Sequence, residues 1–247
     1  MRVISLVPSM TESLLSSSAT IVGVTRYCEV REYPVVGGTK DPDIAKIAEI
    51  DPDLVILDKH ENRREDFEAL KSKGVNTFAT SIASIDDLVR EFSDLNAKFD
   101  LGLLQFQEGI ATGAFHRSKE EIKDSSSAAV SFEIKPSIKA LVPIWRNPYM
   151  AVNGKTYAGD LLRRIGIEVI GGETEYSKID LASFRGKVDL ILAPSEPYKF
   201  TKRQLPELLE VAPRVEFVDG KDLFWWGVRT PAAIVRLRSQ LARVEIG

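Results

Sequence analysis

The sequence has few residues that form covalent or metal cross-links. Its 247 residues include one cysteine, Cys28, and two histidines, His60 and His116. A single cysteine excludes an internal disulfide. These three side chains are also too few for the usual structural zinc site, which takes four such ligands from the protein. We interpret Cys28 as a small buried residue and not as a nucleophile, because no base partner can be identified for it.

An excess of basic charge and a long apolar run are also absent. The chain carries 33 Lys and Arg against 36 Asp and Glu, a net charge of −3 at pH 7. A general nucleic-acid surface needs a basic stripe and is therefore excluded. No apolar run approaches the roughly 20 residues of a membrane span. Residues 1–8 read as a core strand and not as a signal peptide. We expect a cytoplasmic protein as the sequence stands, or a periplasmic or extracytoplasmic one if a leader was removed.

Motifs that bind nucleotide phosphates are missing as well. No GxGxxG follows an expected strand, and GxxxxGK[ST] does not occur, so nucleotide binding has no support. Ser9 and Ser195 lack the flanking pattern of a nucleophile elbow.

The sequence contains an internal repeat. Three short landmarks recur in the same order and at nearly one spacing, which is hard to obtain by chance. They indicate two similar lobes in one chain, with a cleft between them. The landmarks are residues 6–8 with 141–143, 35–38 with 169–172, and 53–57 with 189–192.

Short apolar runs alternate with helical patterns in both halves. The runs are continuous and rich in Val, Ile and Leu, which suits parallel strands covered on both faces. This alternation predicts α/β lobes. Ser9 and Glu12 have the spacing of a capping box at the first helix. Strands are expected at 2–7, 20–24, 53–57, 75–79, 138–144, 167–170, 188–193 and 214–218. Helices are expected at 11–17, 42–50, 62–73, 85–95, 156–165, 182–186, 202–210 and 230–244.

The middle of the chain has a different pattern. Apolar residues at 99, 103, 106 and 110 form a helical seam. We expect one long helix between the lobes, which would act as a stiff spine. The predicted organisation is an N-terminal α/β lobe at 1–95, a connecting helix and loop at 96–135, and a C-terminal α/β lobe at 136–247.

Ligands of open parallel sheets lie beyond the carboxyl ends of the strands. All three tryptophans follow expected strands there, together with Tyr149 and Tyr198. Large aromatics in these loops suit a broad, partly apolar ligand. The alternative is that they pack the ends of the lobes. Because Trp225 and Trp226 are adjacent, we expect them to point in different directions.

His60 lies in a charged loop after the run at 53–57. It is a candidate axial ligand for the metal of a macrocycle, or a general base. The alternative is a solvent-exposed polar residue. His116 is interpreted as a solvated residue on the spine.

Several stretches carry a resemblance to a known family. The most specific are Ser-Leu-Val-Pro-Ser-Met-Thr-Glu at 5–12 and Ser-Glu-Pro-Tyr-Lys-Phe at 195–200. Over nearly its whole length the chain resembles the bilobal substrate-binding proteins for vitamin B12 and iron-siderophores, the helical-backbone metal receptor group. It is most similar to those labelled cobalamin-binding. Further matching stretches lie at 36–38, 51–55, 61–63, 145–148 and 226–229.

The resemblance implies a class III periplasmic-binding-protein-like fold, with two Rossmann-like lobes joined by a long backbone helix. It implies a non-catalytic protein without a required cofactor. The bound ligand would be a corrinoid such as cobalamin first, and a siderophore or haem next. The candidate ligand-binding residues, from the resemblance and the strand-end loops together, are Ser9, Thr11, Tyr27, Lys59, His60, Trp145, Tyr149, Glu196, Tyr198, Trp225, Trp226 and Arg229.

The family's transport-coupled members present one glutamate on each lobe to an ABC-type permease. Those places hold Ala45 and Leu181, with Glu49 and Asp180 nearby, which argues against docking to a permease and leaves ligand binding intact. Two other functions stay open. One is a chelatase-like enzyme on the same scaffold that uses His60 and a glutamate as acid–base groups. The other is an interaction module with an acidic surface.

Overall fold

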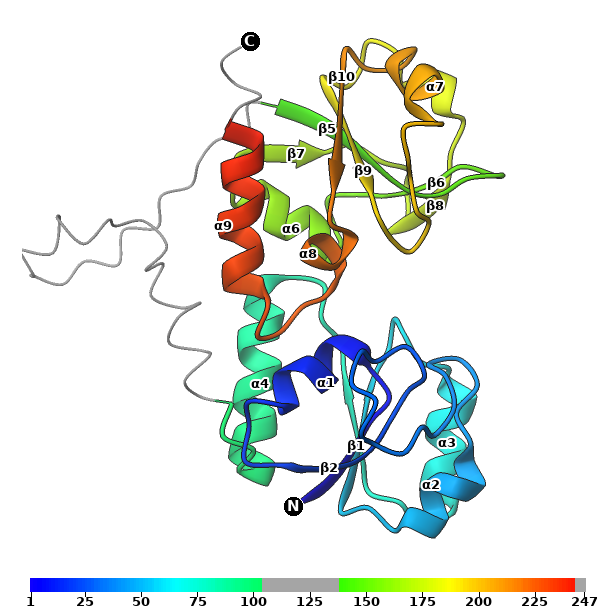
Figure 1. Cartoon of the computed structure of the whole chain (residues 1–247), viewed down its shortest axis with the longest axis vertical. Helices are drawn as coiled ribbons and strands as arrows, with labels where there is room; N and C mark the ends of the chain where they lie inside the picture. Colours follow the sequence, from blue (N-terminus) through cyan, green and yellow to red (C-terminus); the bar gives the residue numbers. More distant parts are fainter. Residues whose placement is uncertain (104–137, 243–247) are drawn as a thin grey trace, which may run out of the picture. The chain divides into compact units, whose positions relative to one another are not determined.

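The computed structural model describes residues 1–103 and 138–242. Within these ranges the chain forms two compact units, drawn in Figure 1. The first comprises residues 1–82, 86–103 and 226–229, and the second comprises residues 83–85, 138–225 and 230–242. The connecting helix and loop predicted at 96–135 lie, beyond residue 103, outside the described residues, as does His116.

The first unit is built on a parallel sheet of strands β1 (Arg2–Ser5), β2 (Thr20–Val24), β3 (Leu54–Asp58) and β4 (Thr77–Thr80), in the order β2-β1-β3-β4. Helices α1 (Pro8–Leu14) and α4 (Ile85–Phe99) lie on one side of it, and α2 (Ile44–Ile50) and α3 (Arg64–Ser72) on the other (Figure 1). Ile47 of α2 and Leu70 of α3 pack on Ile4, Val55 and Leu57 of the sheet. Burial on both faces explains why the strands read as continuous apolar runs.

The second unit repeats this arrangement. Its parallel strands β7 (Ile167–Val169), β5 (Ile138–Trp145), β9 (Leu190–Pro194) and β10 (Arg214–Val218) lie side by side in that order. Two short strands, β6 (Met150–Val152) and β8 (Tyr176–Lys178), continue the sheet in antiparallel fashion from the second half of β5. The unit's helices are α6 (Tyr157–Arg163), the 3₁₀ helix η2 (Leu181–Phe184), α7 (Leu205–Leu209), α8 (Gly220–Phe224) and α9 (Thr230–Leu241).

The two sheets therefore share one order of four parallel strands, and the predicted α/β fold is confirmed. Two of the repeated landmarks belong to equivalent strands. Residues 6–8 directly follow β1 and residues 141–143 lie within β5, while the runs at 53–57 and 189–192 form most of β3 and β9. The third landmark does not. Val169 is the last residue of β7, whereas Val35 lies outside β2 and only bridges its end at Val24.

The capping box predicted at the first helix is wrong. Helix α1 begins at Pro8, and its N-cap is Val7, an extended residue without a side-chain cap. Proline suits the first helical position because its φ is already helical and its missing N–H would have no partner there. The carboxylate of Glu12 binds Arg229 instead. Strands β6 and β8 and helix α8 were not predicted.

Asp160 of α6 caps the start of helix α4. Its Oδ2 accepts a hydrogen bond from the Ile85 N–H at 2.9 Å, and its carboxylate also binds Arg163 and Arg164, each at 2.9 Å. Burial alone would raise the pKa of Asp160. The Ile85 N–H and the two guanidinium groups outweigh burial and hold this pKa below its ordinary value.

We expect Asp160→Asn to lower the free energy of unfolding of the second unit by about 1–3 kcal/mol at pH 7. A carboxyl whose pKa is lower folded than unfolded stabilises the fold above its unfolded pKa, and this contribution is lost as pH falls through the folded value. The difference in unfolding free energy between the wild type and Asp160→Asn should therefore shrink below about pH 4. Urea unfolding followed by circular dichroism measures it. Glu210→Gln, which breaks the exposed ion pair with Arg185, serves as the control and should change little. A difference that persists in full at pH 2 would contradict this account.

Candidate functional site

Four aromatic side chains form a row at the carboxyl ends of β5 and β9, and we call them the aromatic row. Trp145 lies edge-on to Tyr198, with ring centroids 5.8 Å apart, and Tyr198 lies edge-on to Phe200 at 4.8 Å. Tyr149 stacks on Phe200 at 6.4 Å. Phe200 is buried, whereas Trp145 is 45% exposed. The row thus runs from the core to an exposed aromatic surface of the kind that binds flat, apolar ligands.

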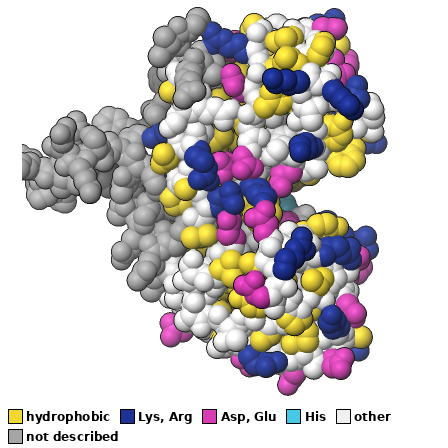
Figure 2. Space-filling model, viewed as in Figure 1, with side chains coloured by type: hydrophobic (Ala, Val, Ile, Leu, Met, Phe, Trp, Pro, Cys, Tyr) yellow, Lys and Arg dark blue, Asp and Glu magenta, His cyan; other side chains and the backbone are white. Residues whose placement is uncertain are grey.

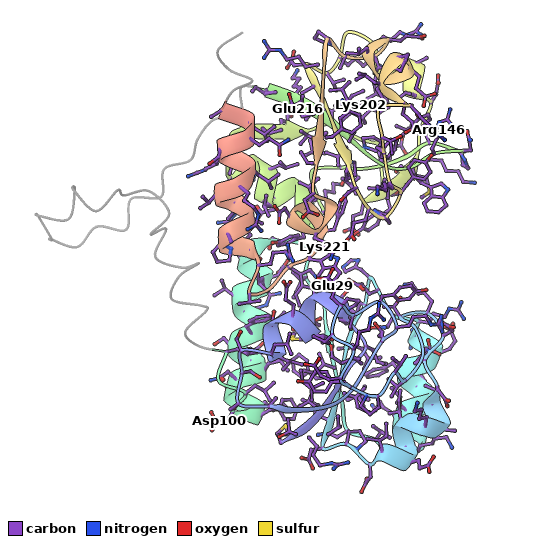
Figure 3. The ribbon with its side chains drawn as sticks, viewed as in Figure 1. Glu29, Asp100, Arg146, Lys202, Glu216 and Lys221 are labelled. Carbon is purple, nitrogen blue, oxygen red and sulfur yellow. The ribbon has the colours of Figure 1, made fainter. Side chains whose placement is uncertain are left out.

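A hairpin of residues 146–149 connects β5 to β6 and carries one end of the aromatic row. Trp145 is the last residue of β5, whereas the sequence had placed it in a loop. Glu207 of α7 holds both ends of the hairpin. It accepts hydrogen bonds from Arg146 Nε at 2.8 Å and from the Tyr149 hydroxyl at 2.6 Å on Oε1, and from Arg146 Nη2 at 3.1 Å on Oε2. Figure 3 shows Arg146 on this hairpin.

Hydrogen bonding and burial at the hairpin determine the protonation states of Glu207 and Tyr149. The hydrogen bond with Arg146 is the main cause that lowers the pKa of Glu207, so its carboxylate stays ionised. Burial, followed by the hydrogen bond to Glu207, raises the pKa of Tyr149. The hydroxyl of Tyr149 therefore stays protonated and remains a donor. Sequence reasoning did not identify Glu207, because nothing along the chain links it to a hairpin some 60 residues earlier.

The loops after β9 and β10 hold two further candidates. Gly220 packs so closely on the first loop that a Cβ would lie 2.5 Å from Glu196 Cγ, which explains the glycine at the start of α8. The Gly220 N–H also donates to Ser195 Oγ at 2.9 Å. Trp225 follows α8 and is half-buried. The ammonium of Lys221, which Figure 3 labels, lies 4.7 Å from the Trp225 ring centroid, a cation–π contact.

The candidates of the first unit at its surface are Tyr27, Lys59 and His60, and all three are exposed. The backbone of His60 is fixed on both sides. Its N–H donates to Asp58 Oδ1 at 2.9 Å, and its carbonyl accepts from Lys40 Nζ at 3.0 Å. This arrangement agrees with an exposed polar residue and also with a ligand side chain on a rigid loop, so the axial-ligand role of His60 stays a prediction.

Four residues predicted to contact the ligand are buried or paired within the first unit. Thr11 is buried, donating to the Val7 carbonyl and accepting from the thiol of Cys28. Ser9 is buried in α1, and Trp226 is 4% exposed with its ring edge-on to Phe92 at 6.2 Å. Arg229 forms a bidentate ion pair with Glu12. Contact of these four residues with a ligand stays a prediction, and the proposed site is built without them. Cys28 is buried, as predicted.

No group of three or more His, Cys, Asp or Glu side chains in residues 1–103 and 138–242 could hold a metal ion, and no helix in these ranges is long and apolar enough to cross a membrane. Ala45 and Glu49 are exposed on α2, and Asp180 caps η2 through the Ala182 N–H. On the face shown in Figure 2, basic and acidic side chains are interspersed over both units. That face therefore gives the interaction-module alternative no extended acidic patch.

No protein-family model and no curated protein matches the sequence. Solved structures match over nearly the whole chain. The periplasmic heme-binding protein BhuT in complex with two hemes has a TM-score of 0.75 at 17% identity, with 98% of each chain covered. The periplasmic vitamin B12 binding protein BtuF of Vibrio cholerae has a TM-score of 0.73 at 16% identity, covering 100% of this chain and 98% of that one. An ABC transporter substrate-binding protein from Listeria monocytogenes has a TM-score of 0.73 at 18% identity, with 97% of each chain covered.

These likenesses establish the fold. The chain has the two-lobed α/β fold of class III periplasmic binding proteins, and the resemblance seen in its sequence is confirmed at that level. The positions of the two units relative to one another are not determined. The predicted cleft between the lobes therefore stays a prediction.

Proposed function

We propose that the chain is a non-catalytic binding protein that holds a metal macrocycle or a metal chelate, a corrinoid first and a siderophore or haem next. The aromatic row carries this proposal. An exposed tryptophan braced by Tyr198 offers a flat apolar surface that complements the face of a macrocycle. Compared structures described as binding heme or vitamin B12 share the fold over nearly the whole chain, which supports the proposal. They give the chelatase-like alternative no support.

Each unit, taken by itself, offers candidate contacts for the ligand. From the second unit they are Trp145, Tyr198, Glu196 and Trp225, with Tyr149 as a brace. From the first unit they are Tyr27, Lys59 and His60, with His60 as the candidate axial ligand. The macrocycle is cargo, and no resident cofactor is proposed.

We also propose extracytoplasmic delivery of this cargo to an ABC-type permease. The Listeria protein of the same fold is described as an ABC transporter substrate-binding protein, which supports this step. Ala45 and Leu181 supply no carboxylate at the two docking places. A permease would therefore have to contact other side chains, with Glu49 and Asp180 as the candidates.

Cyanocobalamin or dicyanocobinamide should raise the melting temperature. At a free concentration of 100 times Kd, linkage adds about 2.7 kcal/mol of stability, which corresponds to roughly 5–10 °C for a chain of this size. The measurement is differential scanning fluorimetry together with the visible spectrum of each complex. Hemin and a ferric siderophore are run in parallel, and a response to one of them alone would identify the ligand class. The proposal is overturned if none of these probes shifts the melting temperature of the protein and none changes its visible spectrum when the protein is added.

The same spectra test the axial ligand. Aquocobalamin exchanges its bound water for an imidazole, so ligation by His60 should shift its absorption bands in the wild type and leave them unshifted in His60→Ala. Lys59→Ala is the matched control on the same loop and should keep the shift. An identical spectrum for wild type and His60→Ala would exclude ligation.

A further inference from the structure

We propose that Glu207 is a positioning residue, which fixes the 146–149 hairpin and thereby holds Trp145 in place for the ligand. The inference rests on the proposed function, because it assumes that Trp145 contacts the ligand. It assigns a role to a side chain on α7 that lies outside the aromatic row.

The hydrogen bonds of Glu207 restrain the hairpin at both ends. Arg146 directly follows Trp145, and Tyr149 directly precedes β6. Both of these residues donate to the one carboxylate, at distances of 2.6 to 3.1 Å. Two parallel bonds from an arginine fork are directional as well as strong. A loop that is held at its first and its last residue by one side chain has little freedom to tilt.

The strand itself gives Trp145 a weaker restraint. The pairing of β5 with β6 is irregular between Pro143 and Trp145, so the sheet ladder is interrupted next to the tryptophan. The Trp145 ring is 45% exposed, and its described aromatic contact is the edge of Tyr198. Restraint from α7 therefore complements an incomplete ladder.

The restraint also reaches the rest of the aromatic row. Tyr149 stacks on Phe200, and Phe200 contacts Tyr198, which contacts Trp145. By fixing the Tyr149 hydroxyl, Glu207 fixes the far end of this row as well as the backbone beside Trp145. The tryptophan is thus held from two directions by one carboxylate, and a ligand would meet a preorganised surface. Preorganisation improves affinity because less side-chain and loop freedom is lost on binding.

A double-mutant cycle with cyanocobalamin as the probe tests this role. We expect Glu207→Ala to raise Kd about tenfold, and to raise it less than twofold in a Trp145→Ala background, because Glu207 acts through Trp145. Glu207→Gln keeps an acceptor and should restore most of the affinity. Tyr149→Phe keeps the stack on Phe200 and removes one donor, so its Kd should fall between those of the wild type and Glu207→Ala. Glu210→Ala breaks the exposed pair with Arg185 near the same helix and is the matched control.

Fluorine NMR gives a readout that needs no ligand. A protein labelled with 5-fluorotryptophan has three tryptophan sites, and Trp145→Phe assigns the Trp145 resonance. Glu207→Ala should shift or broaden that resonance and leave those of Trp225 and Trp226 unchanged. If the wild type binds no probe, the proposed function has failed, and this spectrum alone decides the role of Glu207. The inference is overturned if the Trp145 resonance does not change, or if Glu207→Ala raises Kd equally with and without Trp145.

Discussion

Replacing Trp226 by alanine should lower the free energy of unfolding of the first unit by about 3–5 kcal/mol, the range for removal of a large buried aromatic. The ring is 4% exposed and packs edge-on to Phe92 of α4. Its removal leaves a cavity that the neighbouring chain cannot easily fill. Gly227, the next residue, lies against Ser13 of α1, and the Val228 N–H donates to Ser13 Oγ at 3.0 Å. The backbone on that side is thereby held in place.

Trp225→Ala is the matched control for this change. Trp225 is half-buried in the second unit and is covered by the Lys221 ammonium, so its loss should cost about 1 kcal/mol. Urea unfolding followed by circular dichroism measures both variants, and Trp226→Phe should fall between wild type and Trp226→Ala. Equal losses at the two adjacent positions would contradict the core role of Trp226.

Trp145→Ala should have the opposite profile, with a large effect on binding and a small one on stability. We expect a loss of about 3 kcal/mol of binding free energy, more than a hundredfold in Kd, as is common for a tryptophan at the centre of a binding surface. Because the ring is 45% exposed, its removal leaves no closed cavity. Isothermal titration with the corrinoid that binds the wild type measures Kd, and thermal unfolding without ligand measures stability.

Tyr176→Ala is the control for loss of an exposed aromatic. Tyr176 lies on β8, is 47% exposed, and is not part of the aromatic row. Its removal should leave Kd within about twofold of the wild type. Trp145→Phe should retain part of the affinity, because it keeps an aromatic face. A Kd unchanged by Trp145→Ala would remove the observation that carries the proposed function.

The sequence predicted the central parallel strands well because β3 and β9 are apolar and buried on both faces. The run at 53–57 becomes β3, of which Leu54 to Leu57 are buried. Strand β8 could not be found in this way, because Tyr176, Ser177 and Lys178 have no strand pattern and become a strand only by pairing with β6. Helix α1 was placed three residues late, since Ser9 suggested a cap where Pro8 in fact begins the helix.

The candidate site was predictable in type and less so in detail. Aromatics at strand ends identified Trp145 and Tyr198. They also suggested Trp226, which packs in the core, because the sequence cannot show which of two adjacent rings turns inward. Glu207 and Asp58 were missed since their roles depend on partners that folding brings to them, Arg146 in one case and Thr80 together with the His60 backbone in the other.

Each unit includes a short segment from the other half of the sequence. Residues 226–229 complete the first unit, and residues 83–85 complete the second. A gene fragment that ends at residue 103 would leave Phe92 without Trp226 and Glu12 without Arg229. The halves of this duplicated chain are therefore not interchangeable modules. Recombination that swaps one half for that of a relative would have to transfer these segments too, and fragments expressed separately should complement one another better than either folds alone.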